Sequence, residues 1–394
     1  MNNKSDIFDE AENFSLALGG PLFQFFLRTR LSGPALELLY RRIIVITAIA
    51  WLPLLLLTAL QGRLVGGVQL PFLFAVDAQV RLLVVLPLLI AAELFVHEWS
   101  RGIVRQFLDR EIIAAEDRPR FNGIVASALR LRNSIVMELL LSGLAFAGHW
   151  AALAQTLNVS MWYGAWVDGA LHLTPAGDWF AWISLPLARF ILLRWYFRLF
   201  IWYRFLWQVA RLPLRLNALH PDHAGGLGFL ARSMFAFSPV LLAHTVFLSG
   251  AIANRIWHAG AHLPEFKLEI AGILIFLLLL VLIPLTFFSV KLAYAKRSGL
   301  REYGDVAGVY ARDFRAKWIE GRNPDGERLL GTGDIQSLAD LANSFAVASE
   351  TRLMPFGRAQ VVSLAIILAA PLLPLLLFVI PLEEMIDRIV ALLL

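Results

Sequence analysis

The sequence predicts an all-α membrane protein, a polytopic bundle of about seven transmembrane helices with a small helical hairpin in the cytoplasm. Hydrophobic residues make up 58% of the 394-residue chain and charged residues only 16%, whereas ordinary soluble domains carry about 25% charged residues. Apolar runs long enough to cross the hydrocarbon core as α-helices recur along the whole chain. Basic residues gather in alternate connections between these runs, as they do in membrane proteins of fixed orientation.

Seven apolar segments are the predicted spans, at residues 43–60, 82–99, 135–157, 179–203, 234–256, 268–290 and 359–380. The connection 100–134 carries seven arginines, whereas the connection 158–178 carries no Lys or Arg. Because basic connections stay on the cytoplasmic side, the alternation places the N-terminus in the cytoplasm.

The predicted spans divide the chain into four parts. These are a cytoplasmic N-terminus with an interfacial helix (1–42), a six-span bundle (43–290), a cytoplasmic helical extension (291–358), and the last span with an amphipathic tail (359–394). The first 13 residues are polar and acidic, so we expect no cleavable signal peptide, and the first span acts as its own signal.

Ionisable side chains inside predicted spans are costly in hydrocarbon, so they mark candidate functional sites. They form a predicted polar core of six residues: Glu93, His97, His149, Arg189, Arg194 and His244. Counted at about 1.5 Å per residue, Glu93 and Arg189 lie at similar depth near the midplane, which predicts a buried ion pair. Arg198 lies close enough to the cytoplasmic boundary to extend its charge into water. A structural ion pair, a water-lined ion path and a substrate site all remain open as roles for this core.

The loop before the fifth predicted span contains the string HPDHAGGLGFL at residues 220–230. Glycines followed by a helix start offer free backbone amides to an anion such as a phosphate, a lipid headgroup or a permeating ion. The predicted anion or headgroup site consists of three glycines and two neighbouring arginines: Gly225, Gly226, Gly228, Arg215 and Arg232. A purely structural turn is a second interpretation of this loop. The third is a divalent metal site formed by His220, Asp222 and His223.

Several chemistries are not favoured by the sequence. The chain has no cysteine, which excludes disulfides, thiolate nucleophiles and cysteine metal sites. Nucleophile-elbow, zinc-protease and Walker A motifs are missing, so we expect no cofactor, and an enzyme is the less favoured class. The net charge of +5 is concentrated where membrane orientation places basic residues, so nucleic acid is not an expected partner.

The HPDHAGGLGFL string and the string DIQSLADLANSF at residues 334–345 resemble those of uncharacterised bacterial inner-membrane proteins. The resemblance covers the C-terminal half of the chain. It implies a multi-pass protein of the bacterial inner (plasma) membrane, and it implies no activity.

Together these features favour a channel or permeation-type protein with a charged intramembrane core. Its expected partners are the lipid bilayer, anionic lipid headgroups, ions and further copies of the same chain. Two other functions stay open. One is a non-conducting sensor or scaffold that acts through residues 291–358. The other is a membrane enzyme that acts on lipid with His220, Asp222 and His223.

Overall fold

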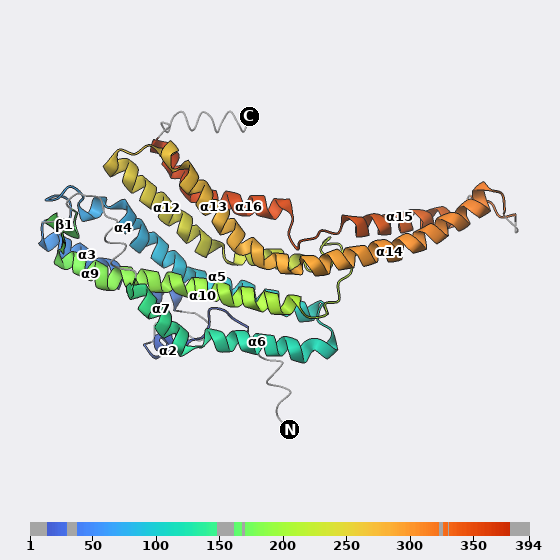
Figure 1. Ribbon diagram of the computed structural model, residues 1–394, viewed down its shortest axis with the longest axis horizontal. Coiled ribbons are helices and arrows are strands. Elements are labelled where there is room, and N and C mark those ends of the chain that lie inside the picture. The colour runs from blue at the N-terminus through green and yellow to red at the C-terminus, as the bar shows by residue number, and fades with distance from the viewer. Residues whose placement is uncertain are drawn as a thin grey trace, which may run out of the picture.

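The computed structural model describes residues 14–29, 38–147, 161–167, 170–322, 326–329 and 331–378 (Figure 1). Within these ranges the protein is an all-α bundle, and its one sheet is a two-stranded antiparallel hairpin of β1 (Gly164–Val167) and β2 (Ala170–Leu173). The fold class predicted from the sequence is therefore confirmed.

The helices of the first half are α2 (Pro21–Arg28), α3 (Leu39–Leu60), α4 (Val76–Val80), α5 (Leu86–Asp109), α6 (Arg118–Arg132) and α7 (Ile135–Ala147). The helices of the second half are α9 (Pro175–Trp179), α10 (Leu185–Ala210), α11 (Arg232–Ala236), α12 (Ser238–Ala259), α13 (Lys267–Leu282), α14 (Ser289–Phe314), α15 (Asp334–Glu350) and α16 (Arg358–Ala369).

Six continuous helical stretches are long and apolar enough to cross a membrane: Leu39–Leu60, Val76–Asp109, Pro175–Ala210, Ser238–Ala259, Leu263–Ile319 and Arg358–Phe378. They coincide with six of the seven predicted spans, so the chain is a multi-pass membrane protein. The remaining predicted span, 135–157, begins as the apolar helix α7, and its second half lies outside the described residues.

Helix α3 shows how the spans divide their surfaces between protein and lipid. Its buried side chains include Ile46, Ala50 and Leu54, which recur every four residues and so form one stripe along the helix. Leu52 and Leu56 are exposed on the other side. An exposed apolar face is costly in water and favourable in lipid, so this surface fits a bilayer.

Three of the six stretches contain a π-helical turn, and one of these, Arg315–Ile319, lies at the end of α14 away from the bundle. The other two turns lie in the bundle. The residues Arg81–Val85 form such a turn between α4 and α5, and Phe180–Ser184 form the other between α9 and α10. A π-turn inserts one extra residue into a helix and changes the direction of the side chains around it. Both turns lie in the half of the bundle that carries the β-hairpin (Figure 1).

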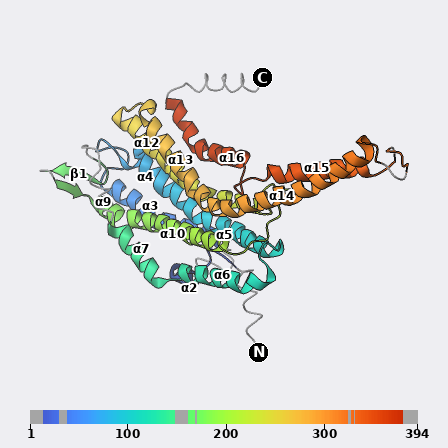
Figure 2. The same ribbon diagram turned by 45° about the vertical axis from the view of Figure 1, so that its right-hand side comes forward.

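The bundle is organised around α10, which packs against α5, α6 and α7, while α12 packs against α4, α5 and α16. Helices α14 and α15 pack against each other and project away from the bundle in both views (Figures 1 and 2). The six residues Ile283–Phe288, in 3₁₀ conformation with Pro284 near their start, join α13 to α14. The projecting hairpin is therefore continuous with a membrane span.

Candidate functional site

Three arginines converge on one carboxylate inside the bundle. Glu93 on α5 forms ion pairs with Arg42 of α3 at 2.5 Å, with Arg198 of α10 at 2.8 Å and with Arg194 of α10 at 3.7 Å. All four residues are less than 8% exposed. Arg194 and Arg198 are four residues apart on one helix, so their side chains share a face and reach the same partner.

A second carboxylate extends this group toward α7. Glu138 pairs with Arg194 at 3.4 Å, and its other oxygen accepts a hydrogen bond of 2.8 Å from the backbone N–H of Leu22. We refer to Arg42, Glu93, Glu138, Arg194 and Arg198 together as the Glu93 cluster. Because α3, α5, α7 and α10 all contribute, the cluster fixes how four helices sit against one another.

The N-terminal segment, residues 14–20, lies against the cluster. The guanidinium of Arg198 donates to the carbonyl oxygen of Ala17, and Nδ1 of His97 lies 2.8 Å from the hydroxyl of Ser15. The side chains of Phe14, Ser15, Leu16 and Ala17 are at most 1% exposed. The segment therefore fills the interior beside the cluster.

Arg132, at the end of α6, adds a fourth guanidinium near this segment. Its Nη1 donates a hydrogen bond of 2.6 Å to the carbonyl oxygen of Ser15. Burial and, as a second cause, the positive charge of Arg198 together lower the pKa of Arg132 to about 10. The group still carries its proton at neutral pH, so a fourth guanidinium charge lies beside residues 14–20, next to the three arginines of the Glu93 cluster.

The expected ion pair between Glu93 and Arg189 is wrong. Arg189 is five residues before Arg194 and therefore points about 140° away from it around the helix, so equal depth does not bring it to Glu93. Arg198 was expected to extend its charge into water, and instead it lies in the interior bound to Glu93. The structure joins Glu93, His97 and Arg194 of the predicted polar core within one region.

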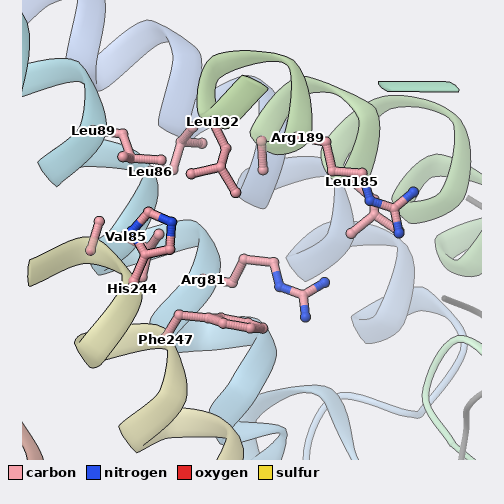
Figure 3. Close-up of a pocket in the computed structure, with 11 residues that line it drawn as sticks. Arg81, Val85, Leu86, Leu89, Leu185, Arg189, Leu192, His244 and Phe247 are labelled. Carbon is pink, nitrogen blue, oxygen red and sulfur yellow. The ribbon is translucent and has the colours of Figure 1, made fainter. Parts of the chain in front are cut away.

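The other members of the predicted polar core lie elsewhere. Arg189 and His244 line a separate pocket between α5, α10 and α12 (Figure 3). His149 lies outside the described residues. The polar core therefore forms two separate sites, and the sequence did not distinguish them.

Four functional candidates were missed in the sequence: Arg42, Glu138, Arg198 and Ser15. Glu138 gave a usable signal, because it is a carboxylate inside the predicted span 135–157, as Glu93 is inside 82–99. Arg42 directly precedes the predicted span 43–60, but the helix begins at Leu39 and takes Arg42 into the bundle. Ser15 gave no sequence signal.

The glycine loop does not leave its amides free. The carboxylate of Asp222 accepts hydrogen bonds from the backbone N–H groups of Ala224 at 2.8 Å, Gly226 at 3.1 Å and Gly228 at 2.8 Å. Burial alone would raise the pKa of Asp222, but these donors outweigh it and hold the pKa below its usual range. The predicted anion site is thus occupied by a side chain of its own loop.

The remaining residues of that predicted site lie apart from the amides. Arg215 pairs with Glu116 at 3.5 Å on the surface, and Arg232 is exposed. Gly225 and Gly226 have φ of +63° and +97°, a region of backbone conformation that favours glycine, so the role of these two glycines is conformational.

No metal site forms from the loop either. His220 lies 2.9 Å from Asp222, but Nδ1 of His223 faces Glu350 of α15 at 3.7 Å. Across the described residues, no group of three His, Asp or Glu side chains is arranged to hold a metal ion. Asp222 and His223 instead bind the hairpin, because Arg352 donates from its side chain to the carbonyl of Asp222 and from its backbone to that of His223.

The chain matches no protein-family model, no curated protein and no solved structure. Any function must therefore be argued from the geometry of the two arginine sites and of the loop that binds the hairpin.

Proposed function

We propose that the protein is a permeation-type membrane protein that conducts anions past the Glu93 cluster, and that residues 14–20 close this path. The observation that carries the proposal is a surplus of positive charge among the described residues, since three arginines share the carboxylates of Glu93 and Glu138 and a fourth, Arg132, lies beside residues 14–20. Uncompensated charge in a membrane interior is costly, and a small anion would compensate it. Fixed positive charge also repels cations from such a path.

The form of the N-terminal segment supports its role as a closure. Its backbone is irregular over residues 14–20, and irregular backbone inside a membrane protein is tolerated where protein or water surrounds it. Phe14 packs on Phe205 and Trp202, with ring centroids 5.3 and 6.5 Å apart, and Ser15 and Ala17 hold the segment by hydrogen bonds. Because the segment itself is not helical, it can leave without unfolding a transmembrane helix.

The proposed setting is the bacterial inner membrane, with the N-terminus in the cytoplasm and several copies in each assembly. The seven arginines of residues 100–134 support this orientation. Val306 and Val309 on α14 are about half exposed outside the bilayer-facing surface, which supports contact with another copy.

The test is ion flux into liposomes that contain the full chain. Chloride entry is followed with an entrapped halide-quenched dye, and potassium entry with a potassium-sensitive dye. Replacing Phe14 and Leu16 together by serine should release the segment and raise chloride flux several-fold. Adding Arg198→Gln to that variant should lower chloride flux again, because it removes one of the charges that attract the anion.

The matched control replaces Ile319 and Ile335 by serine, which makes the same number of apolar-to-polar changes outside the bundle. This control should leave flux unchanged. The proposal fails if the released variant is folded, as judged by its melting temperature, and passes no chloride. It also fails if potassium enters faster than chloride.

A further inference from the structure

A pocket of about 320 Å³ lies between α5, α10 and α12. Its walls are mostly apolar, and they include Leu86, Leu89, Leu192 and Ala188. Figure 3 shows the guanidinium groups of Arg81 and Arg189 at one end and the His244 ring at the other, with Leu86 and Leu89 near the histidine. The pocket thus has a cationic end and an apolar end.

Among the described residues, neither arginine at the cationic end has a carboxylate partner. Within the described part of the chain, no salt bridge involves Arg81 or Arg189. Asp77 is the acidic residue that acts on Arg81, four residues before it, and it makes no direct contact of salt-bridge length. Nη1 of Arg189 is buried and has no hydrogen-bond partner among the described residues. A buried, unpaired guanidinium nitrogen is costly and favours an anion from outside the chain.

At the apolar end, the polar side chain of His244 has hydrogen-bond partners within the protein. His244 Nδ1 lies 2.7 Å from the carbonyl oxygen of Val240, and a carbonyl only accepts, so Nδ1 carries the proton. Nε2 lies 2.6 Å from the hydroxyl of Tyr196. Both ring nitrogens therefore have hydrogen-bond partners, and the contact with Tyr196 joins α12 to α10 at this end of the pocket.

The two π-helical turns of the bundle border this pocket. Arg81 and Val85 are the first and last residues of one turn, and Leu185 directly follows the other. π-Turns lie often at functional sites, where the extra residue aims a side chain that a regular helix would direct elsewhere. The cationic end is therefore built by local departures from helical geometry.

We propose that this pocket binds a single-chain carboxylate amphiphile, in its simplest form a long-chain fatty-acid anion. The carboxylate would lie between Arg81 and Arg189, whose planar guanidinium groups match its geometry. The acyl chain would follow Leu86, Leu89 and Leu192 toward His244. A volume at the lower end of the range for small-molecule sites suits one acyl chain better than the two of a phospholipid. This site is separate from the Glu93 cluster and does not depend on the permeation proposal.

The test measures binding of radiolabelled palmitate to the purified full chain in a non-ionic detergent. We expect saturable binding, and we expect Arg81→Gln and Arg189→Gln each to weaken it roughly tenfold or more, because each removes a charge-assisted hydrogen bond. The matched control is Arg255→Gln on α12, whose guanidinium pairs with Glu269 at the surface, and it should bind palmitate normally. Methyl palmitate, which lacks the charge, should not compete.

A second variant keeps the test decisive if the arginine variants unfold. Ala188→Phe adds a ring at the half-buried wall of the pocket and leaves both arginines in place, so it should abolish palmitate binding while the melting temperature stays close to that of the parent. The proposal is overturned if the folded parent does not bind palmitate, or if methyl palmitate competes as well as the acid. It is also overturned if phosphatidylglycerol displaces palmitate at lower concentration than unlabelled palmitate does, since a two-chain lipid would then be the occupant.

Discussion

Arg194 and Arg189 lie five residues apart on α10, yet their surroundings are opposite. Arg194 is buried between the carboxylates of Glu93 and Glu138, whereas Arg189 faces a pocket in which the described residues offer it no carboxylate. The helix turns about 140° between them, so one faces the protein interior and the other a gap between helices. Arginines on one membrane helix can therefore have different roles, and their direction around the helix decides which partner each meets.

The largest effect that this comparison predicts is at Glu93. Glu93→Gln removes the carboxylate shared by Arg42, Arg194 and Arg198 and leaves their charges buried together. We expect a loss of about 3 to 5 kcal/mol in the free energy of unfolding. The loss is measured by thermal unfolding in detergent. Glu98→Gln, an exposed carboxylate on the same helix, serves as the control and should change stability little. Equal melting temperatures for the two variants would contradict the assignment of Glu93.

The contrast between the two arginines of α10 predicts a smaller effect. Arg194→Gln leaves Glu138 without its arginine and should cost about 1 to 3 kcal/mol, because Glu93 keeps two other partners. Arg189→Gln should be neutral to within about 0.5 kcal/mol or stabilising, since it removes a charge that has no partner. The same unfolding measurement compares them. If both variants lost the same stability, Arg189 would have a partner, and this would contradict the difference proposed between Arg189 and Arg194.

The smallest effect is expected in the loop outside the spans. Asp222→Asn weakens the hydrogen bonds from Ala224, Gly226 and Gly228 and should cost about 1 to 2 kcal/mol at neutral pH. Because folding lowers the pKa of Asp222, this contribution is present above the unfolded pKa and disappears as pH falls through the folded pKa. The melting temperatures of parent and variant should therefore converge in acid. A constant difference down to the lowest pH would exclude the carboxylate as its source.

The spans could be predicted from the sequence, whereas the partners of the charged residues could not. Apolar length and the distribution of arginines depend on the bilayer alone, so they located six long helices correctly. Depth along a helix was then used to pair Glu93 with Arg189, and this failed because depth carries no information on direction. Glu93 and Arg194 were nevertheless correctly singled out, since a buried charge in a span needs a partner of some kind.

The predicted anion site in the loop at residues 220–228 was wrong for a different reason. Its glycines do present backbone amides to an anion, as the pattern indicates, but the anion is the carboxylate of Asp222 within the same string. A Cβ at Gly228 would lie 2.9 Å from Asp222, so glycine is needed there to let the carboxylate approach. Local patterns identify the donors, and only the folded loop shows which acceptor reaches them first.

Ion selectivity tests the central claim most directly. Liposomes containing the variant with serine at positions 14 and 16 are loaded with concentrated potassium chloride, diluted into a low concentration of the same salt, and followed with a potential-sensitive dye. If the surplus of guanidinium groups at the Glu93 cluster selects anions, chloride leaves faster than potassium and the concentrated interior becomes positive. An interior that becomes negative, or that develops no potential although the variant is folded, would contradict the account.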